Sequence, residues 1–147
     1  MRWIYLSPHL DDAAFSCGGL IWQQAAAGDA VEICTVFSEG LPAEFPAPCC
    51  DSWPGVDFDT MKRRQEEDAA SCRLLGAAPR HLGLRDACCR RSEGTGSWLY
   101  PSLHAVTGRL APADLPTADS VLALLMRLPE GSSVVSPLAL GNHVVTS

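Results

Sequence analysis

The sequence lacks the excess of positive charge with which many proteins bind nucleic acids and anionic membranes. Its 11 Lys and Arg residues are outnumbered by 17 Asp and Glu residues, which gives a formal net charge of -6. A chain of this charge has no general attraction to polyanions, so we expect neither nucleic acid nor a membrane among its partners. A neutral or cationic small molecule is compatible with the charge, and homo-oligomerisation stays open.

Long apolar runs and a secretion signal are also lacking. No apolar run approaches the ~20 residues that span a bilayer, and the first residues have a strand pattern in place of a basic region, an apolar stretch and a cleavage site. We therefore expect a soluble, cytoplasmic protein. The seven cysteines have no regular spacing, which favours reduced thiols over a disulfide framework. The adjacent pairs lack the spacing of a zinc knuckle and are interpreted as loop thiols: Cys49 with Cys50, and Cys88 with Cys89.

No complete glycine-rich phosphate loop is present. Gly94 and Gly96 flank Thr95, but a third glycine and a preceding strand are missing, so a nucleotide-binding α/β module is the weakest function that we consider. No internal repeat or extended apolar heptad is found either. A length of 147 residues with 47% hydrophobic residues suits one globular domain.

Apolar, β-branched segments alternate with amphipathic segments along the chain. This alternation predicts an α/β fold, a single Rossmann-like three-layer domain with a mainly parallel sheet over residues 1–147. We expect strands at residues 3–7, 31–37, 80–84 and 133–136, and helices at residues 13–27, 59–75 and 115–128. The first two helices are expected to end at Gly28 and Gly76. In the second helix, a solvated, ion-paired face is expected from Lys62, Arg63, Arg64, Glu66, Glu67 and Asp68.

The stretch from Ser7 to Gly19, SPHLDDAAFSCGG, leads from the first expected strand into the first helix. Ligand sites in such sheets lie beyond the carboxyl ends of the strands, so His9, Asp11 and Asp12 should lie there together. An imidazole and a carboxylate three residues apart can both turn toward one divalent cation, which leaves Asp11 to act as a base. The alternative is structural, because an Asp can cap a helix and a His can satisfy a backbone carbonyl. Two Asp and a His exceed what capping requires, and we favour a hydrolase site.

Two further segments are expected near this edge of the sheet. The proline-rich connection 38–57 leaves the second strand there, and it either lines the site or is an ordinary surface loop. Asp86 follows the third expected strand, where it either faces the site or forms an Asx-type turn. His81 and His104 have no comparable position after a strand, and we interpret both as ordinary histidines.

The stretch PHLDDAAFSCGG resembles the His-x-Asp-Asp signature of the LmbE-like (PIG-L) zinc-dependent N-deacetylases. Later segments that look like the family pattern are Arg64-Gln65-Glu66-Glu67-Asp68 with Leu75-Gly76, then Asp86, then Gly141-Asn142-His143-Val144. The resemblance implies an amide hydrolase that removes an acetyl group from an N-acetylated amino sugar or a similar acetamido compound.

The same resemblance implies roles for individual residues. Zinc would be held by His9 and Asp12, and Asp11 would be the catalytic base. His143 would polarise the acetyl carbonyl or protonate the leaving amine. Asp86 would contact the substrate, and Arg64 would help to shape the substrate site.

The resemblance breaks near the end of the chain. The second histidine of the family's last motif, its third metal ligand, falls on Thr146, and the intervening acid falls on Val145. Threonine is a poor zinc ligand, and valine has no hydrogen-bond acceptor. Relatives also continue past this motif, so we expect a domain without the family's C-terminal elements, with zinc weakly bound or absent and deacetylation impaired. The alternative is a non-catalytic family member that serves as a binding or interaction domain.

Overall fold

A four-stranded sheet forms the centre of the computed structural model, which describes residues 1–41, 58–138 and 144. The strands are β1 (Arg2–Ser7), β2 (Ala30–Glu39), β3 (Ala78–Arg85) and β4 (Ser133–Val135), in the spatial order β3-β2-β1-β4. Every pairing between these strands is parallel. The predicted α/β fold with a parallel sheet is thereby confirmed.

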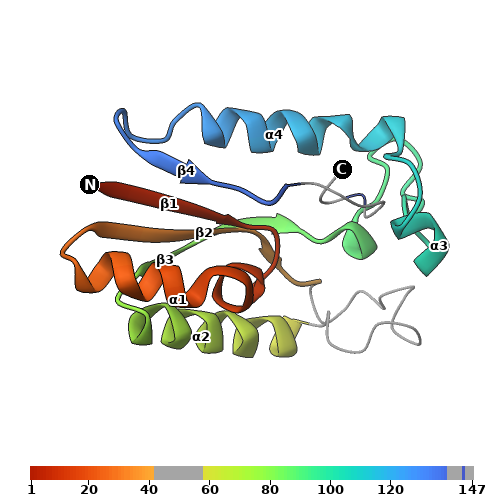
Figure 1. The fold of residues 1–147 in the computed structure, drawn as a ribbon. Helices are drawn as coiled ribbons and strands as arrows, with labels where there is room; N and C mark the ends of the chain where they lie inside the picture. The colour runs from red at the N-terminus through yellow and green to blue at the C-terminus, as the bar shows by residue number, and fades with distance from the viewer. Residues whose placement is uncertain (42–57, 139–143, 145–147) are drawn as a thin grey trace.

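Helices cover both faces of the sheet (Figure 1). Helices α1 (Asp12–Ala26) and α2 (Phe58–Leu74) lie on one face, and α4 (Leu115–Leu125) lies on the other. Between β3 and α4 the chain forms the short helices η1 (Ala87–Cys89), α3 (Leu103–Val106) and η2 (Pro112–Asp114). The largest apolar cluster packs α1 and α2 on the sheet, through Tyr5, Ala13, Ile21, Val31, Ile33, Cys72 and Ala77. Within the described part of the chain, none of these helices has the length and apolar character needed to span a bilayer.

The first two helices end where glycines allow the backbone to turn. Gly28 has φ +89 and Gly76 has φ +76, a left-handed conformation that residues with a Cβ rarely adopt. A Cβ at Gly76 would also lie 2.9 Å from the Cβ of Ala25. Both predicted helix ends are confirmed, and Gly76 additionally permits the close approach of α1 to the end of α2.

The charged face expected on α2 is only partly solvated. Arg63 and Glu67 are exposed and lie 3.8 Å apart, as expected for a surface ion pair. Asp68, however, is buried, which corrects the expectation for this residue. It shares the inner stripe of the helix with Met61 and Cys72, both buried at helical spacing from it.

The adjacent cysteines after β3 are core residues. Cys88 and Cys89 are both buried and pack with Leu41 and Trp98, which corrects their interpretation as loop thiols. The 3₁₀ turn of η1 directs both side chains inward. The other pair, Cys49 with Cys50, lies outside the described residues, as does most of the connection 38–57.

The carboxyl ends of three strands meet at one edge of the sheet. β1 ends at Ser7 opposite Thr35 of β2, and β3 ends at Arg85 opposite Glu39 of β2. Because the strands are parallel, the residues that follow them emerge on the same side. The expected positions of His9 and Asp86 after β1 and β3 are therefore brought together in space.

Candidate active site

The corner between β1 and α1 is held by the buried hydroxyl of Ser7. Its Oγ donates to the His9 carbonyl over 2.6 Å and accepts from the Ala13 N–H over 3.0 Å. The carboxylate Oδ2 of Asp12 accepts from the His9 N–H over 2.9 Å. Asp11 occupies the N-cap position of α1 but makes no side-chain capping hydrogen bond. The capping explanation for Asp11 therefore does not hold, because Ser7 satisfies a first-turn N–H in its place.

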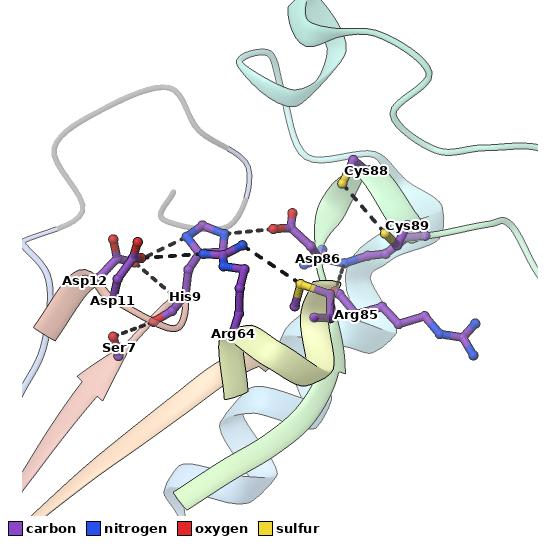
Figure 2. A network of polar contacts seen from close by, with 11 residues as sticks. Ser7, His9, Asp11, Asp12, Arg64, Arg85, Asp86, Cys88 and Cys89 are labelled. Atoms are coloured by element: carbon purple, nitrogen blue, oxygen red, sulfur yellow. Dashed lines mark hydrogen bonds and ion pairs between the residues drawn. The ribbon is translucent and has the colours of Figure 1, made fainter. Parts of the chain in front are cut away.

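The imidazole of His9 lies between two carboxylates from different parts of the chain (Figure 2). Its Nδ1 is 3.3 Å from Asp12 Oδ2, and its Nε2 is 3.1 Å from Asp86 Oδ2. The His9 side chain is 24% exposed and the Asp86 side chain is 21% exposed. The ring centroid of Phe37 lies 6.2 Å from that of His9, with the planes tilted by 46°. His9 is thus fixed on both nitrogens and flanked by an aromatic ring.

These contacts favour the imidazolium form of His9. Burial alone would lower the pKa of His9, but the hydrogen bonds to Asp12 and Asp86 outweigh it and raise this pKa to about 9. The hydrogen bond with His9 lowers the pKa of Asp12, against an opposing effect of burial. Burial raises the pKa of Asp86, but His9 and the nearby charge of Arg90 bring it below its ordinary value. Without a bound cation, the site is therefore one imidazolium between two carboxylates at neutral pH.

Asp11 faces a different cation from Asp12. Its Oδ1 lies 3.8 Å from Arg64 Nη2, and its side chain is half exposed. Arg64 reaches this position from α2 (Figure 2), with its other terminal nitrogen 3.9 Å from the sulfur of Met61. An ion pair this long and this exposed contributes little to stability. Both side chains are consequently available to a molecule that enters the site.

Five of the site residues predicted from the sequence gather at the carboxyl edge of the sheet: His9, Asp11, Asp12, Arg64 and Asp86. His143, Val145 and Thr146 lie outside the described residues. Asp86 occupies the expected place after β3, although the contact it makes here is with His9.

The positions of His9 Nδ1 and Asp12 Oδ2 fit two of the ligands of a zinc site. Zn–N and Zn–O bonds of about 2.0–2.2 Å in a tetrahedron place neighbouring donors roughly 3.3–3.5 Å apart. The 3.3 Å between His9 Nδ1 and Asp12 Oδ2 agrees with this spacing. Within residues 1–41, 58–138 and 144, however, no group of three or more His, Cys, Asp or Glu side chains is arranged to hold a metal ion. A third protein ligand would have to come from outside that part of the chain.

Sequence reasoning missed a second His–Asp pair behind the site. His81 Nε2 in β3 lies 2.7 Å from Oδ2 of Asp68, whose side chain is 3% exposed. Burial raises the pKa of Asp68, and the hydrogen bond from His81 opposes this. The signal was the helical spacing that places Asp68 in line with Met61 and Cys72. A carboxylate on that stripe requires a buried partner, so His81 is not an ordinary histidine.

A parallel sheet with one histidine and three aspartates gathered at its carboxyl edge defines an α/β protein with a polar site beyond its strand ends. The model of the family "PIG-L: GlcNAc-PI de-N-acetylase" matches residues 4–145. The chain belongs to this family, which confirms the resemblance seen in its sequence.

Individual relatives are deacetylases. The chain is 33% identical to a 2'-N-acetylparomamine deacetylase of Streptomyces fradiae over 147 residues, which cover 97% of this chain and 47% of that protein. Among solved structures, a deacetylase in complex with teicoplanin superposes with a TM-score of 0.75 at 29% identity, covering 99% of this chain and 61% of the other. The zinc-inhibited form of a teicoplanin deacetylase gives a TM-score of 0.74 at 28% identity, covering 97% and 58%. The chain thus spans about half the length of the curated relative.

Proposed function

We propose that this chain acts in the metal-dependent removal of an acetyl group from an N-acetylated amino sugar or a similar acetamido compound. The observation that carries the proposal is the convergence of His9, Asp12 and Asp86 on one point of the sheet edge in a PIG-L family chain. The name of the Streptomyces relative supports an N-acetylated amino sugar as the substrate class. A small-molecule substrate and a cytoplasmic location complete the proposal.

His9 Nδ1 and Asp12 would hold the ion, which we take to be zinc. The ion would supply Lewis-acid chemistry that polarises the acetyl carbonyl and activates water. Asp86 accepts a hydrogen bond from Nε2–H of His9, so it would fix the tautomer in which the Nδ1 lone pair is free to bind the ion. This is an orienting role, in addition to the substrate contact that the family resemblance implies for this residue.

The remaining polar groups would act on water and substrate. Asp11 is half exposed, and it would accept the proton of the attacking water. Arg64, beside it, would donate hydrogen bonds to the substrate. From the sequence, His143 would stabilise the oxyanion or protonate the leaving amine.

A second candidate function is a non-catalytic binding or interaction domain. It is favoured by one specific observation, namely that the described residues contain no group of three side chains arranged to hold a metal. The threonine at position 146 agrees with this candidate, because the family places a histidine there. The two candidates differ in whether the chain binds metal and hydrolyses an acetamide.

Metal content and turnover should be measured together on four proteins. These are the parent chain, Asp11→Asn, the double variant Val145→Asp with Thr146→His, and the exposed control Glu67→Gln. The substrate is 2'-N-acetylparomamine, with zinc at one equivalent and in excess, because a related deacetylase has a zinc-inhibited form.

We expect substoichiometric zinc and slow turnover in the parent and in the Glu67→Gln control. The double variant should bind zinc more tightly, because a third ligand completes the usual catalytic set. Asp11→Asn should keep the zinc of the parent and lose turnover. No zinc and no turnover in any protein would favour the binding domain. Stoichiometric zinc with fast turnover in the parent would show that another group completes the site.

A further inference from the structure

Arg90 is a buried residue to which the proposed function assigns no role. It follows η1 and is only 7% exposed, which is unusual for an arginine. Its Nε donates to the Arg85 carbonyl over 2.9 Å, and its Nη1 donates to Asp114 Oδ2 over 2.5 Å. The carbon of its guanidinium lies 4.6 Å from the ring centroid of Phe37. One side chain thereby joins three segments that are far apart in the sequence.

The first of these contacts lies at the peptide bond that precedes Asp86. The Arg85 carbonyl that accepts from Arg90 belongs to the peptide bond immediately before Asp86. Two further hydrogen bonds close the same turn, from Cys89 N to the Asp86 carbonyl at 2.9 Å and from Arg90 N to the Ala87 carbonyl at 3.1 Å. The Arg90 side chain thus adds a hydrogen bond to the turn that carries the Asp86 carboxylate.

The contact of Arg90 with Phe37 reaches the corner that carries His9. The Phe37 N–H donates to the carbonyl of Pro8, directly before His9, over 2.9 Å. The Phe37 ring is thus near both groups, with the guanidinium of Arg90 over it and the imidazole of His9 6.2 Å from its centroid. A planar guanidinium stacks on an aromatic face in a way that an ammonium cannot reproduce.

The contact with Asp114 holds the Arg90 side chain in place. Asp114 is buried, and its Oδ2 also accepts from the Tyr100 hydroxyl over 2.8 Å. That hydroxyl accepts in turn from the N–H of Ala111 over 3.0 Å. A buried, charge-assisted network of this kind holds its members in one geometry.

We propose that Arg90 is a positioning residue for the pair formed by His9 and Asp86. By joining the Asp86 turn to the Phe37 ring, it holds Asp86 Oδ2 3.1 Å from His9 Nε2 and so keeps Nδ1 directed toward Asp12. The inference rests on the proposed function in one respect, namely that His9 and Asp12 are the residues that hold the ion.

The test compares Arg90 with its neighbour. Arg91 is exposed, and its guanidinium lies 3.9 Å from the ring centroid of Trp98, so it offers a matched arginine on an aromatic ring. The variants are Arg90→Met, Arg90→Lys, Arg91→Met and Arg91→Lys. Two quantities are measured on each folded protein, the zinc dissociation constant by competition with a chromophoric chelator, and the ¹⁵N shifts of the His9 ring without zinc. The His9 signals are assigned by their loss in His9→Gln.

We expect Arg90→Met to weaken zinc binding about tenfold or more, as for the loss of other groups that orient metal ligands. Both ring nitrogens of His9 should shift in this variant, and the Arg91 variants should match the parent in both measurements. Arg90→Lys keeps the positive charge beside Asp114 but loses the paired N–H donors of the guanidinium and its stacking on Phe37, so it should show the same changes. If Arg90→Met does not fold, Arg90→Lys is the variant on which the test is decided.

A purely structural role would lower the free energy of unfolding without moving the His9 signals or the zinc affinity. That result in the Arg90 variants would overturn the inference. If the parent chain binds no zinc, the metal-dependent function fails, and the zinc-free His9 shifts still decide whether Arg90 positions this ring.

Discussion

The position of His9 between Asp12 and Asp86 predicts that the stability of the metal-free chain depends on pH. The perturbation is a rise in pH from about 6 to about 10 in the presence of a chelator, applied to the parent and to His9→Gln. The contacts raise the pKa of His9 from 6.5 to about 9 in the folded chain. In the unfolded chain these contacts are lost, and the pKa returns to its ordinary value.

The size and sign of the effect follow from linkage. One pKa unit corresponds to about 1.4 kcal/mol, so a rise from 6.5 to about 9 is worth about 3 kcal/mol at most. Because the folded pKa is the higher one, this stability is fully present below pH 6.5 and is lost as the pH rises through 9. Burial limits solvent screening here, because the His9 side chain is only 24% exposed.

The assay is urea unfolding at a series of pH values, read as the difference in free energy of unfolding between parent and His9→Gln. Other groups that titrate in this range, such as the cysteine thiols, are common to both proteins and cancel in the difference. The difference should shrink by about 3 kcal/mol from pH 6.5 to above 9. NMR titration of the His9 ring provides the second measurement. A ring that titrates near 6.5, with both proteins losing stability in parallel, would refute the reasoning.

Three further predictions concern the same region. Ser7→Ala leaves a buried N–H and a carbonyl without their partner and should lower the free energy of unfolding by about 2 kcal/mol in urea denaturation, whereas Ser7→Thr keeps the hydroxyl and should retain most of the parent's stability. Asp68→Ala should cost about 2 kcal/mol in the same assay because it leaves His81 unpaired, against less than about 0.5 kcal/mol for the exposed Glu67→Ala; equal effects would contradict the burial of Asp68. Zinc affinity, measured by chelator competition, should rise about tenfold per pH unit between pH 7 and 9, because the ion must replace the proton of His9; a pH-independent affinity would contradict this.

The sequence was sufficient to predict the architecture and the corner that carries the site. Alternating apolar and amphipathic segments determine a parallel sheet, and parallel strands bring the residues after β1 and β3 to one edge. His9 and Asp86 could therefore be assigned to the same place without knowing their contacts. The helix ends at Gly28 and Gly76 were equally predictable, because only glycine adopts their backbone conformation at no cost.

Contacts between distant segments were not predictable in the same way. Arg90 binds Asp114 and lies over Phe37, partners 24 and 53 positions away that no local pattern connects with it. The partner of Asp86 was also missed, because a residue after a strand can equally face a substrate. The fold places His9 Nε2 3.1 Å from Asp86 Oδ2, so the two side chains pair.

The charges of the site bear on how it would accept a cation. An imidazolium between Asp12 and Asp86 leaves a net charge of about -1 for the three groups. A divalent cation held at Nδ1 would replace the proton of His9 on that nitrogen, so the three groups would gain one unit of positive charge instead of two. Asp86 would keep its hydrogen bond to Nε2, because that nitrogen would be protonated in both states. The exchange would then require no movement of the Asp86 turn, so the proposed positioning role of Arg90 is compatible with both states of the site.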